Sequence, residues 1–264
     1  MDVFDDARRH YRQGDLDSAL SLLEPLTRRL EPDGLPSPAQ GPSLELLGLV
    51  FQGSGRPFDA ADAIERASLV VPVSDEARIA LASSYAQLRR IDLARELYLQ
   101  LALSRRLPPD LMLQVAAGLD AIDSPQLAMQ VCEWITERDE NVAQAYYDMG
   151  VYSARSGNAL YLTEALTHRA LQLDPGNLHY RIGLASLLVQ LDRDDEAINA
   201  LDGFADEDVD RVTCESCLSR IASLLHRRGQ PDLAKRCEYH AARLRRHGVR
   251  GPRPINALGG EEER

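Results

Sequence analysis

Apolar residues recur along the chain at the spacings of an amphipathic helix, and glycine or proline interrupts the pattern at short intervals. Residues 41–72 show this clearly. Leu44, Leu47 and Phe51 share one helical face, and Gly55 then ends the stretch. The pattern predicts a helix that stops at a tight turn.

A second apolar stripe follows in the same segment. It contains Ala60, Ile64 and Ala67, and Pro72 closes it. Pro57 falls in the turn or the first helical turn, where its missing N–H costs least. The segment therefore predicts a helix, a tight turn, a second helix and a stop.

The same frame recurs in tandem about every 34 residues. Counted from Gly41 as position 1, small residues occupy positions 8 and 20, large apolar residues occupy 4, 11 and 24, and proline stands at 32. The sequence thus predicts an all-α chain of about seven helix–turn–helix units. The predicted units are 1–33, 43–74, 75–108, 109–142, 143–177, 178–211 and 215–247.

Four segments depart from this frame. The end of the first unit slips by one residue, and Pro25 inside its second helix predicts a kink. After Gly157 the distance from turn to proline is off by about one residue, so we expect a longer turn or a register shift there. Residues 31–42 are dense in proline and glycine and are predicted to form a loop. Residues 248–264 lack periodicity and are predicted to be a disordered tail. The repeat domain is therefore expected to cover 1–247.

Composition agrees with a helical protein. Apolar residues make up 44% of the chain and aromatic residues only 5%, and alanine and leucine, both strong helix formers, dominate. The net charge of −11 argues against non-specific binding of nucleic acid by the whole chain. The acidic N-terminal stretch lacks the apolar region of a signal peptide, and no apolar run approaches the ~20 residues of a membrane span. We therefore expect a cytoplasmic protein that does not bind a membrane.

The frame closely resembles the tetratricopeptide repeat. That resemblance implies a solenoid that curves into a right-handed superhelix, with the first helix of each unit lining the concave side. It also implies a protein-binding scaffold or adaptor, because solenoids use such concave surfaces to bind partners. By the resemblance, the inward-facing candidate residues are Arg8, Tyr11, Glu45, Leu49, Gln52, Ile79, Ser83, Leu113, Gln114, Tyr147, Asp148, Val151, Ile182 and Ser186.

These side chains give a groove that is modestly apolar with scattered charge, which suits a helix or an extended protein segment with a few apolar anchors. Tyr147 is the expected best anchor, and Asp148 and Glu45 would favour a segment that carries Arg or Lys. Some members of the family capture a C-terminal carboxylate with a lysine and asparagine clamp. Lys235 is the only lysine here, so that mode is not favoured.

Three of the four cysteines lie near the C-terminal end of the repeat region. Cys214 and Cys217 form a C-x-x-C, and Cys237 and His240 form a C-x-x-H. Such a set can bind zinc, and a C-x-x-C at a helix N-terminus can be redox-active. In antiparallel helices, however, Cys237 and Cys214 would lie roughly 13 Å apart along the axis. We expect mainly structural packing, with a zinc or thiol-redox switch as the alternative.

Charge is uneven at the same end. Between Arg227 and Arg253 there are nine basic residues and two acids, and residues 202–210 just before carry five acids. One interpretation is a basic face for RNA or an acidic partner. The other is a solvated last helix whose cations meet the acidic loop next to it. Tyr239 is the only aromatic residue available for base stacking, so nucleic acid is not favoured.

No catalytic motif is evident. The chain lacks a phosphate-binding glycine loop, H-E-x-x-H and G-x-S-x-G, and Asp194 and Asp195 lie at an expected helix start, where acids favour the helix dipole. We therefore expect no enzyme activity and no cofactor.

Overall fold

The computed structural model describes residues 2–27 and 36–246. Over these ranges the chain is helical and contains no strand, which confirms the all-α prediction. Contacts divide the chain into two units, unit 1 (1–134) and unit 2 (135–264), where the sequence suggested one continuous domain.

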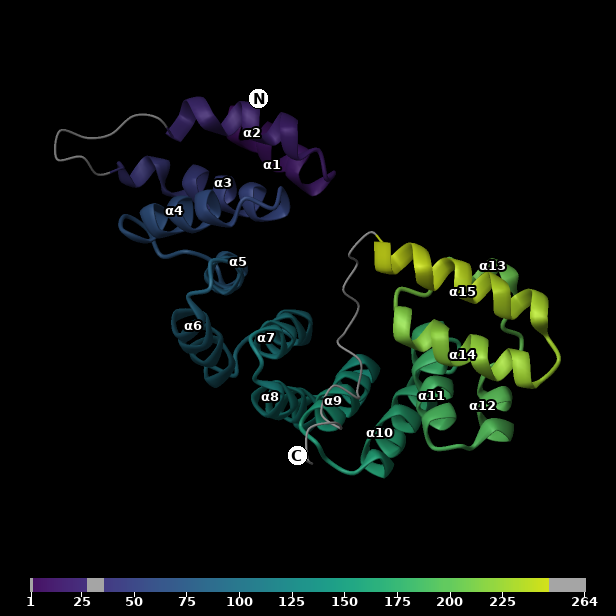
Figure 1. Cartoon of the computed structure of the whole chain (residues 1–264). Helices are drawn as coiled ribbons and strands as arrows, with labels where there is room; N and C mark the ends of the chain where they lie inside the picture. Colours follow the sequence, from purple (N-terminus) through teal and green to yellow (C-terminus); the bar gives the residue numbers. More distant parts are fainter. Residues whose placement is uncertain (1, 28–35, 247–264) are drawn as a thin grey trace, which may run out of the picture. The chain divides into compact units, whose positions relative to one another are not determined.

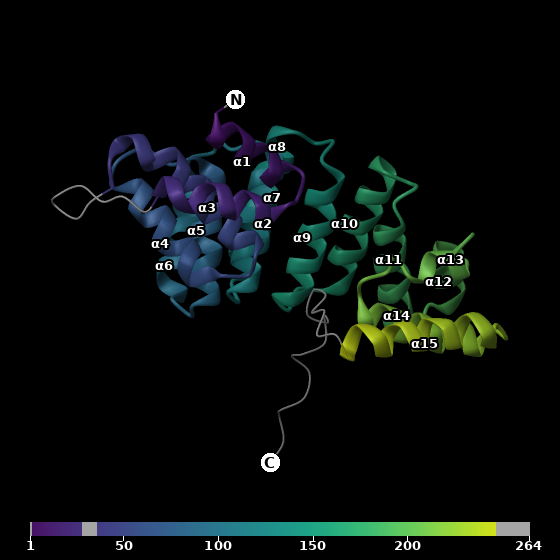
Figure 2. The ribbon, with the colours of Figure 1, turned by 90° about the horizontal axis from the view of Figure 1, so that it is seen from above.

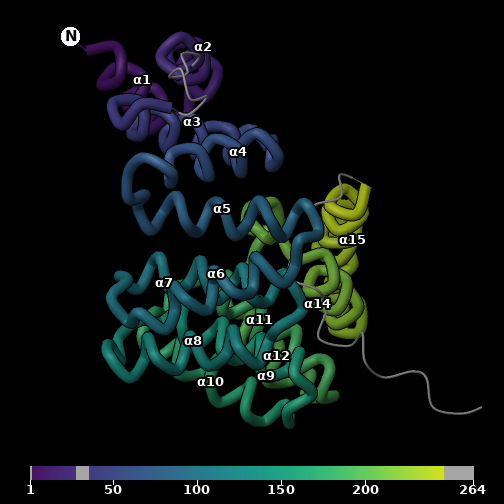
Figure 3. Tube along the Cα trace, turned by 90° about the vertical axis from the view of Figure 1, so that its left-hand side faces the viewer, coloured from purple at the N-terminus to yellow at the C-terminus, as the bar shows by residue number. Residues whose placement is uncertain are grey.

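Unit 1 consists of consecutive helix pairs (Figure 1). Its last helix, α8, continues beyond Trp134, the last residue of the unit. The second helices α2, α4 and α6 each contact the first helix of the next pair, and the first helices α3, α5 and α7 also contact one another in turn. The helices are α1 (Val3–Arg12), α2 (Leu16–Thr27), α3 (Gly41–Gly53), α4 (Pro57–Ser68), α5 (Asp75–Gln87), α6 (Ile91–Leu103), α7 (Pro109–Ala121) and α8 (Pro125–Arg138). Figure 3 follows the stacking of α3 to α6 along the trace.

Unit 2 continues the pattern with α9, α10 and α11 side by side (Figure 2). The last pair, α14 and α15, packs on α11 through α14, and α13 is a short extra helix against α15. The helices are α9 (Ala143–Arg155), α10 (Leu160–Leu173), α11 (Leu178–Gln190), α12 (Asp194–Ala200), α13 (Asp206–Val209), α14 (Glu215–Arg227) and α15 (Pro231–Arg246).

Except for α3, which begins at Gly41, two residues before the predicted unit 43–74, the α-helices fall within the predicted units, although the unit boundaries themselves stay a prediction. The predicted loop 31–42 includes a short 3₁₀ helix, η1 (Pro38–Gln40), and α3 already begins at Gly41; residues 28–35 lie outside the described residues. The predicted tail also lies outside them. The connection from α9 to α10 has four residues, against three in the other pairs, so the longer turn after α9 is confirmed.

Every helix pair in the described ranges reverses direction through the same backbone turn. The second residue past the end of the first helix has a positive φ. The backbone N–H of the residue that follows it donates to the carbonyl five residues earlier in the chain, at 2.8 to 3.1 Å. This is the Schellman arrangement, which satisfies carbonyls left open at a helix end. The left-handed residues are Gly14, Gly55, Arg89, Asp123, Gly157, Asp192 and Gly229.

Small residues then let the two helices of a pair approach. A Cβ on Gly48 would lie 2.4 Å from Cγ1 of Ile64, and Ala60 and Ala94 are fully buried. In unit 2, Thr163 donates its hydroxyl to the carbonyl of Gly150 at 3.1 Å. Positions 8 and 20 of the frame therefore act as close contacts, as the sequence indicated.

Gly55→Ala should destabilise unit 1 by about 1 kcal/mol, because an L-residue with a side chain resists the left-handed conformation. No atom lies within 4 Å of an added Cβ at Gly55, so the cost is purely conformational. Urea denaturation followed by circular dichroism measures it. Gly176→Ala is the matched control, since its Cβ also meets open space and its φ is not positive. Equal midpoints for the two variants would contradict the account.

Ala60→Leu should cost about 1–3 kcal/mol, because extra methylenes cannot fit between α3 and α4 without displacing backbone or side chains. The control is Ala117→Leu, at an exposed position within α7. The free energy of unfolding should fall for Ala60→Leu alone; an unchanged value would show that the helix pair is not tightly packed at this position.

Candidate binding groove

A broad concave surface lies wholly in unit 1. It is a groove of about 1000 Å³, and the first helices of four successive pairs supply every lining residue except Tyr98 of α6. We call it the unit 1 groove. The lining residues are Tyr11, Arg12, Leu49, Gln52, Gly53, Glu76, Ile79, Ala80, Ser83, Ala86, Gln87, Tyr98, Asp110, Leu111, Gln114, Ala117, Gly118 and Ala121.

Hydrogen bonds between α3 and α5 hold part of the groove wall in place. The Gln52 amide donates to the Ser83 hydroxyl at 2.9 Å, and its oxygen accepts from the Ser84 hydroxyl at 2.8 Å. The Gln87 amide also lies 3.4 Å from the Ser83 hydroxyl. Polar groups of neighbouring repeats therefore bond to each other, and Gln87 and Gln114 remain exposed.

Tyr98 reaches the groove because Gly118 makes room for it. A Cβ on Gly118 would lie 2.2 Å from Cζ of Tyr98. Burial raises the pKa of Tyr98 to about 12, so the phenol stays neutral. Burial, with a smaller effect of the Glu76 carboxylate, also raises the pKa of Tyr11. The groove thus combines neutral phenols with the charges of Arg12, Glu76 and Asp110.

The structure brings six of the sequence-predicted residues together in this groove and leaves three others of unit 1 outside it. Arg8 pairs with Asp5 at 2.8 Å, the Glu45 carboxylate accepts the N–H of Ser74 at 3.2 Å, and Leu113 is half-buried. Glu45 therefore joins two repeats. The six residues in the groove are Tyr11, Leu49, Gln52, Ile79, Ser83 and Gln114.

In unit 2 the expected anchor is buried. Tyr147 is 7% exposed, stacks on Tyr180 with ring centroids 4.8 Å apart and lies 4.7 Å from the His179 ring. A Cβ on Gly183 would lie 2.4 Å from the Tyr147 hydroxyl, so the glycine of α11 makes space for the tyrosine of α9. Tyr147 therefore packs in the core of unit 2, and only a small part of its side chain stays accessible.

The other candidate residues of unit 2 are also mostly buried or bonded within the unit. Ile182 is 1% exposed and Ser186 is 3% exposed, with its hydroxyl accepting from Arg220 at 3.1 Å. Val151 is half-buried against the Tyr147 cluster. Ile182 also borders a small cavity of about 270 Å³. Whether any of these residues contacts a partner stays a prediction.

Asp148 sits beside this cluster in an apolar setting. Its carboxylate accepts from the Gln144 amide at 2.7 Å, and Gln144 in turn accepts from the Tyr180 hydroxyl at 3.0 Å. Burial raises the pKa of Asp148 to about 6, and the bond from Gln144 offsets only part of that effect.

The comparisons agree with this architecture. A tetratricopeptide repeat family model matches residues 46–110. A tetratricopeptide repeat protein from Parabacteroides merdae superposes with a TM-score of 0.68 at 16% identity, covering 94% of each chain. The pilF protein of Pseudomonas aeruginosa gives a TM-score of 0.60 at 18% identity, covering 78% of this chain and 91% of its own.

The chain has the fold of the tetratricopeptide repeat proteins. MamA from Desulfovibrio magneticus is also similar, with a TM-score of 0.51 at 18% identity over 61% of this chain and 91% of its own. No curated protein sequence matches the chain.

Several groove residues are not among the inward-facing candidates named from the sequence. Glu76 and Asp110 are the second residues of α5 and α7, and Tyr98 comes from a second helix. The sequence signal for Tyr98 is Gly118, a small residue at a position where this frame does not require one.

The cysteines differ from the sequence-based expectation. Cys214 and Cys217 form a disulfide, where we expected packing of thiols. The pair can join because Cys214 is the N-cap of α14 with an extended backbone, which brings its Cα within 5.3 Å of that of Cys217. Both sulfurs are thereby removed from the proposed zinc set.

The other two residues of the zinc set are His240, which bonds elsewhere, and Cys237, which is buried away from solvent. His240 is buried, its Nε2–H donates to the Val212 carbonyl at 3.0 Å, and its Nδ1 lies 3.4 Å from an Asp210 carboxylate oxygen without hydrogen-bond geometry. Cys237 is fully buried. Among the residues that the structure describes, no three His, Cys, Asp or Glu side chains group so that they could hold a metal ion.

The basic stretch at the C-terminal end is paired with acids. Arg227 and Arg228 bond to Asp194 and Asp195, and Arg236 bonds to Asp210 at 2.7 Å. Arg243 also reaches Asp210, and Arg245 reaches Glu215. These pairs confirm that the cations of the last helices meet neighbouring acids. No helix in the described part of the chain is long and apolar enough to span a bilayer.

Asp148→Asn should stabilise unit 2 by about 1–2 kcal/mol at pH 8 and have little effect at pH 4. The folded-state pKa of about 6 lies above the ordinary value of 3.8 for an aspartate, so wild-type stability falls as pH rises through this window. Asparagine stays neutral and still accepts from Gln144. Thermal unfolding at the two pH values measures the effect.

The control is Asp92→Asn, whose side chain is 98% exposed. It should show no such pH dependence. A loss of stability for Asp148→Asn that is equal at both pH values would contradict the buried carboxylate.

Proposed function

We propose that the chain is a non-catalytic scaffold that binds a protein segment, extended or helical, in the unit 1 groove. The observation that supports this most is the groove itself, to which α1, α3, α5 and α7 each contribute residues. At about 1000 Å³ its volume stands at the upper end of small-ligand sites, which favours a longer segment. We further propose that the protein acts in the cytoplasm, without a cofactor.

The chemistry of the lining indicates what the segment should carry. Leu49 is half-buried and offers most of the apolar surface. Ile79 and Leu111, 6% and 8% exposed, add their edges, so the lining suits one or two aliphatic side chains. Gln87 and Gln114 are exposed amides that can donate to and accept from the backbone of an extended segment. These features favour alternating apolar and polar residues in the partner.

Charge in the groove favours a basic segment. Glu76 and Asp110 are both exposed, against the single cation of Arg12. Opposite charges at the rim speed association and help to select partners, and salt weakens this effect. We therefore propose a partner segment with aliphatic anchors and at least one Arg or Lys.

Selection of random 12-residue peptides on the full chain by phage display tests the proposal. Enriched peptides should combine aliphatic residues with Arg or Lys. Gln114→Arg should weaken the best peptide at least 10-fold, because it adds bulk and positive charge inside the groove, and Glu76→Gln should weaken it about 3-fold and reduce the salt dependence. Fluorescence anisotropy of the labelled peptide gives both affinities.

Arg95→Ala, on the second helix α6 and outside the groove, is the control and should bind like the wild type. If all three variants bind the peptide equally, the interface lies elsewhere. If selection enriches acidic peptides, the groove is not the binding surface that its charge indicates.

A further inference from the structure

We propose that the Cys214–Cys217 disulfide is a thiol–disulfide exchange site, at which an external dithiol attacks Sγ of Cys217 and Cys214 leaves as the thiolate. The site lies in unit 2, whereas the groove lies in unit 1, so neither proposal rests on the other.

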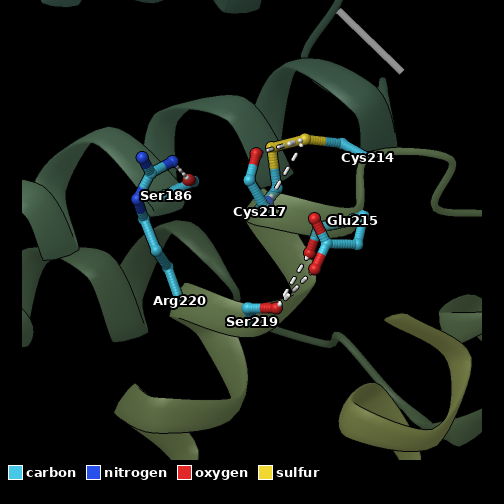
Figure 4. Close-up of a disulfide and its surroundings, with 7 residues drawn as sticks. Ser186, Cys214, Glu215, Cys217, Ser219 and Arg220 are labelled. Atoms are coloured by element: carbon cyan, nitrogen blue, oxygen red, sulfur yellow. Dashed lines mark hydrogen bonds between the residues drawn. A yellow bond between two sulfur atoms is a disulfide. The ribbon is translucent and has the colours of Figure 1, made fainter. Parts of the chain in front are cut away.

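The two sulfurs differ in access. Cys214 is 5% exposed, whereas Cys217, one helical turn into α14, is half-buried. Figure 4 shows the sulfur bridge at the start of α14, with Glu215, Ser219 and Arg220 along the same helix. An incoming thiolate must approach the back of one sulfur in line with the S–S bond, and Cys217 is the more accessible of the two.

The other sulfur is placed to accept negative charge. Cys214 is the N-cap of α14, and its Sγ accepts the backbone N–H of Cys217 at 3.2 Å. The Ser216 hydroxyl lies 3.4 Å from the same sulfur. A helix N-terminus stabilises a thiolate through these N–H groups and the helix dipole, which makes Cys214 the better leaving group.

The reaction balances with a dithiol as the reductant. Its first thiolate forms a bond to Sγ of Cys217, the Cys214–Cys217 bond breaks, and the electron pair goes to Sγ of Cys214. The second thiol of the reductant, as thiolate, then attacks the reductant's first sulfur, which is bonded to Cys217 in the mixed disulfide. The two reductant sulfurs become joined, and Cys217 leaves as a thiolate. The protein gains two thiols, and the reductant becomes a disulfide. The reverse reaction, in which the disulfide of another protein oxidises Cys214 and Cys217, follows the same steps backwards.

The Cys214–Cys217 disulfide is expected to add little to the stability of the fold. It joins residues only three apart, and short closed loops gain least from a cross-link. α14 is already held by Leu218, Ile221 and Leu225 in the core of unit 2. In a reducing compartment, disulfides that form are usually transient and take part in exchange.

The other two cysteines do not take part in this chemistry. Cys237 is fully buried, and burial raises the pKa of its thiol to about 11. Cys132 lies in unit 1 and is also fully buried. The exchange is therefore confined to the C-x-x-C at α14.

The first test uses the full wild-type chain, oxidised with glutathione disulfide and then treated with dithiothreitol. N-ethylmaleimide should label both cysteines of the tryptic peptide 212–220 while the circular dichroism spectrum stays native. Labelling should be at least 10-fold faster than global unfolding. A chain that forms no disulfide, or whose disulfide opens only on unfolding, overturns the proposal.

The direction of attack is read from the mixed disulfide. With reduced glutathione as the probe, tandem mass spectrometry of the same peptide should place at least 5-fold more adduct on Cys217 than on Cys214. A majority on Cys214 would reverse the assigned roles and overturn the proposal.

Matched variants give an independent measurement. With glutathione disulfide, Cys214→Ser should be modified at Cys217 at least 10-fold faster than Cys217→Ser is at Cys214. The double variant measures the background from the buried cysteines, and its melting temperature should be almost unchanged because serine is a good N-cap. Equal rates for the two single variants contradict the difference in access.

Discussion

The left-handed residue that ends each first helix is the constraint on which the rest of the structure depends. A helix can reverse within three residues only if one residue takes a positive φ and the following N–H closes back on the helix end. Glycine supplies that conformation at Gly55 without steric cost, whereas Arg89 and Asp192 adopt it with a side chain. Because this turn recurs, the two helices meet in the same register wherever three residues join them, and the four-residue connection from α9 to α10 shifts that pair by one residue.

That register decides which faces remain open. Within a pair, small residues such as Gly48 and Ala60 bring the helices together, so larger side chains must pack between pairs. In unit 1 this leaves the first helices lining the groove, with polar bonds from Gln52 to Ser83 and Ser84 holding neighbouring repeats. In unit 2 the corresponding space between α9 and α11 is filled by Tyr147 against Gly183. The same repeat therefore produces an open surface in one unit and an aromatic core in the other.

The repeat, its turns and the longer turn after α9 could be predicted from the sequence because they depend on short-range spacing. The depth of each inward-facing residue could not, since it depends on the neighbouring repeat: Gly183, 36 residues away, determines that Tyr147 is buried. The disulfide likewise depends on whether Cys214 caps α14 or continues it, a choice that one residue of register decides. The sequence predicts that the cations of the last helix meet the adjacent acidic stretch, but it does not predict which residues pair, such as Arg236 with Asp210.

Site-specific photo-crosslinking can show whether the unit 1 groove receives a protein segment. A benzophenone amino acid replaces Gln87, which is exposed in the groove, or Arg95, which lies outside it, in the full chain. With a basic, aliphatic peptide obtained by selection on this chain, irradiation should yield a covalent adduct from position 87 and none from position 95. Adducts from position 95 alone, or equal adducts from both positions, would contradict the claim.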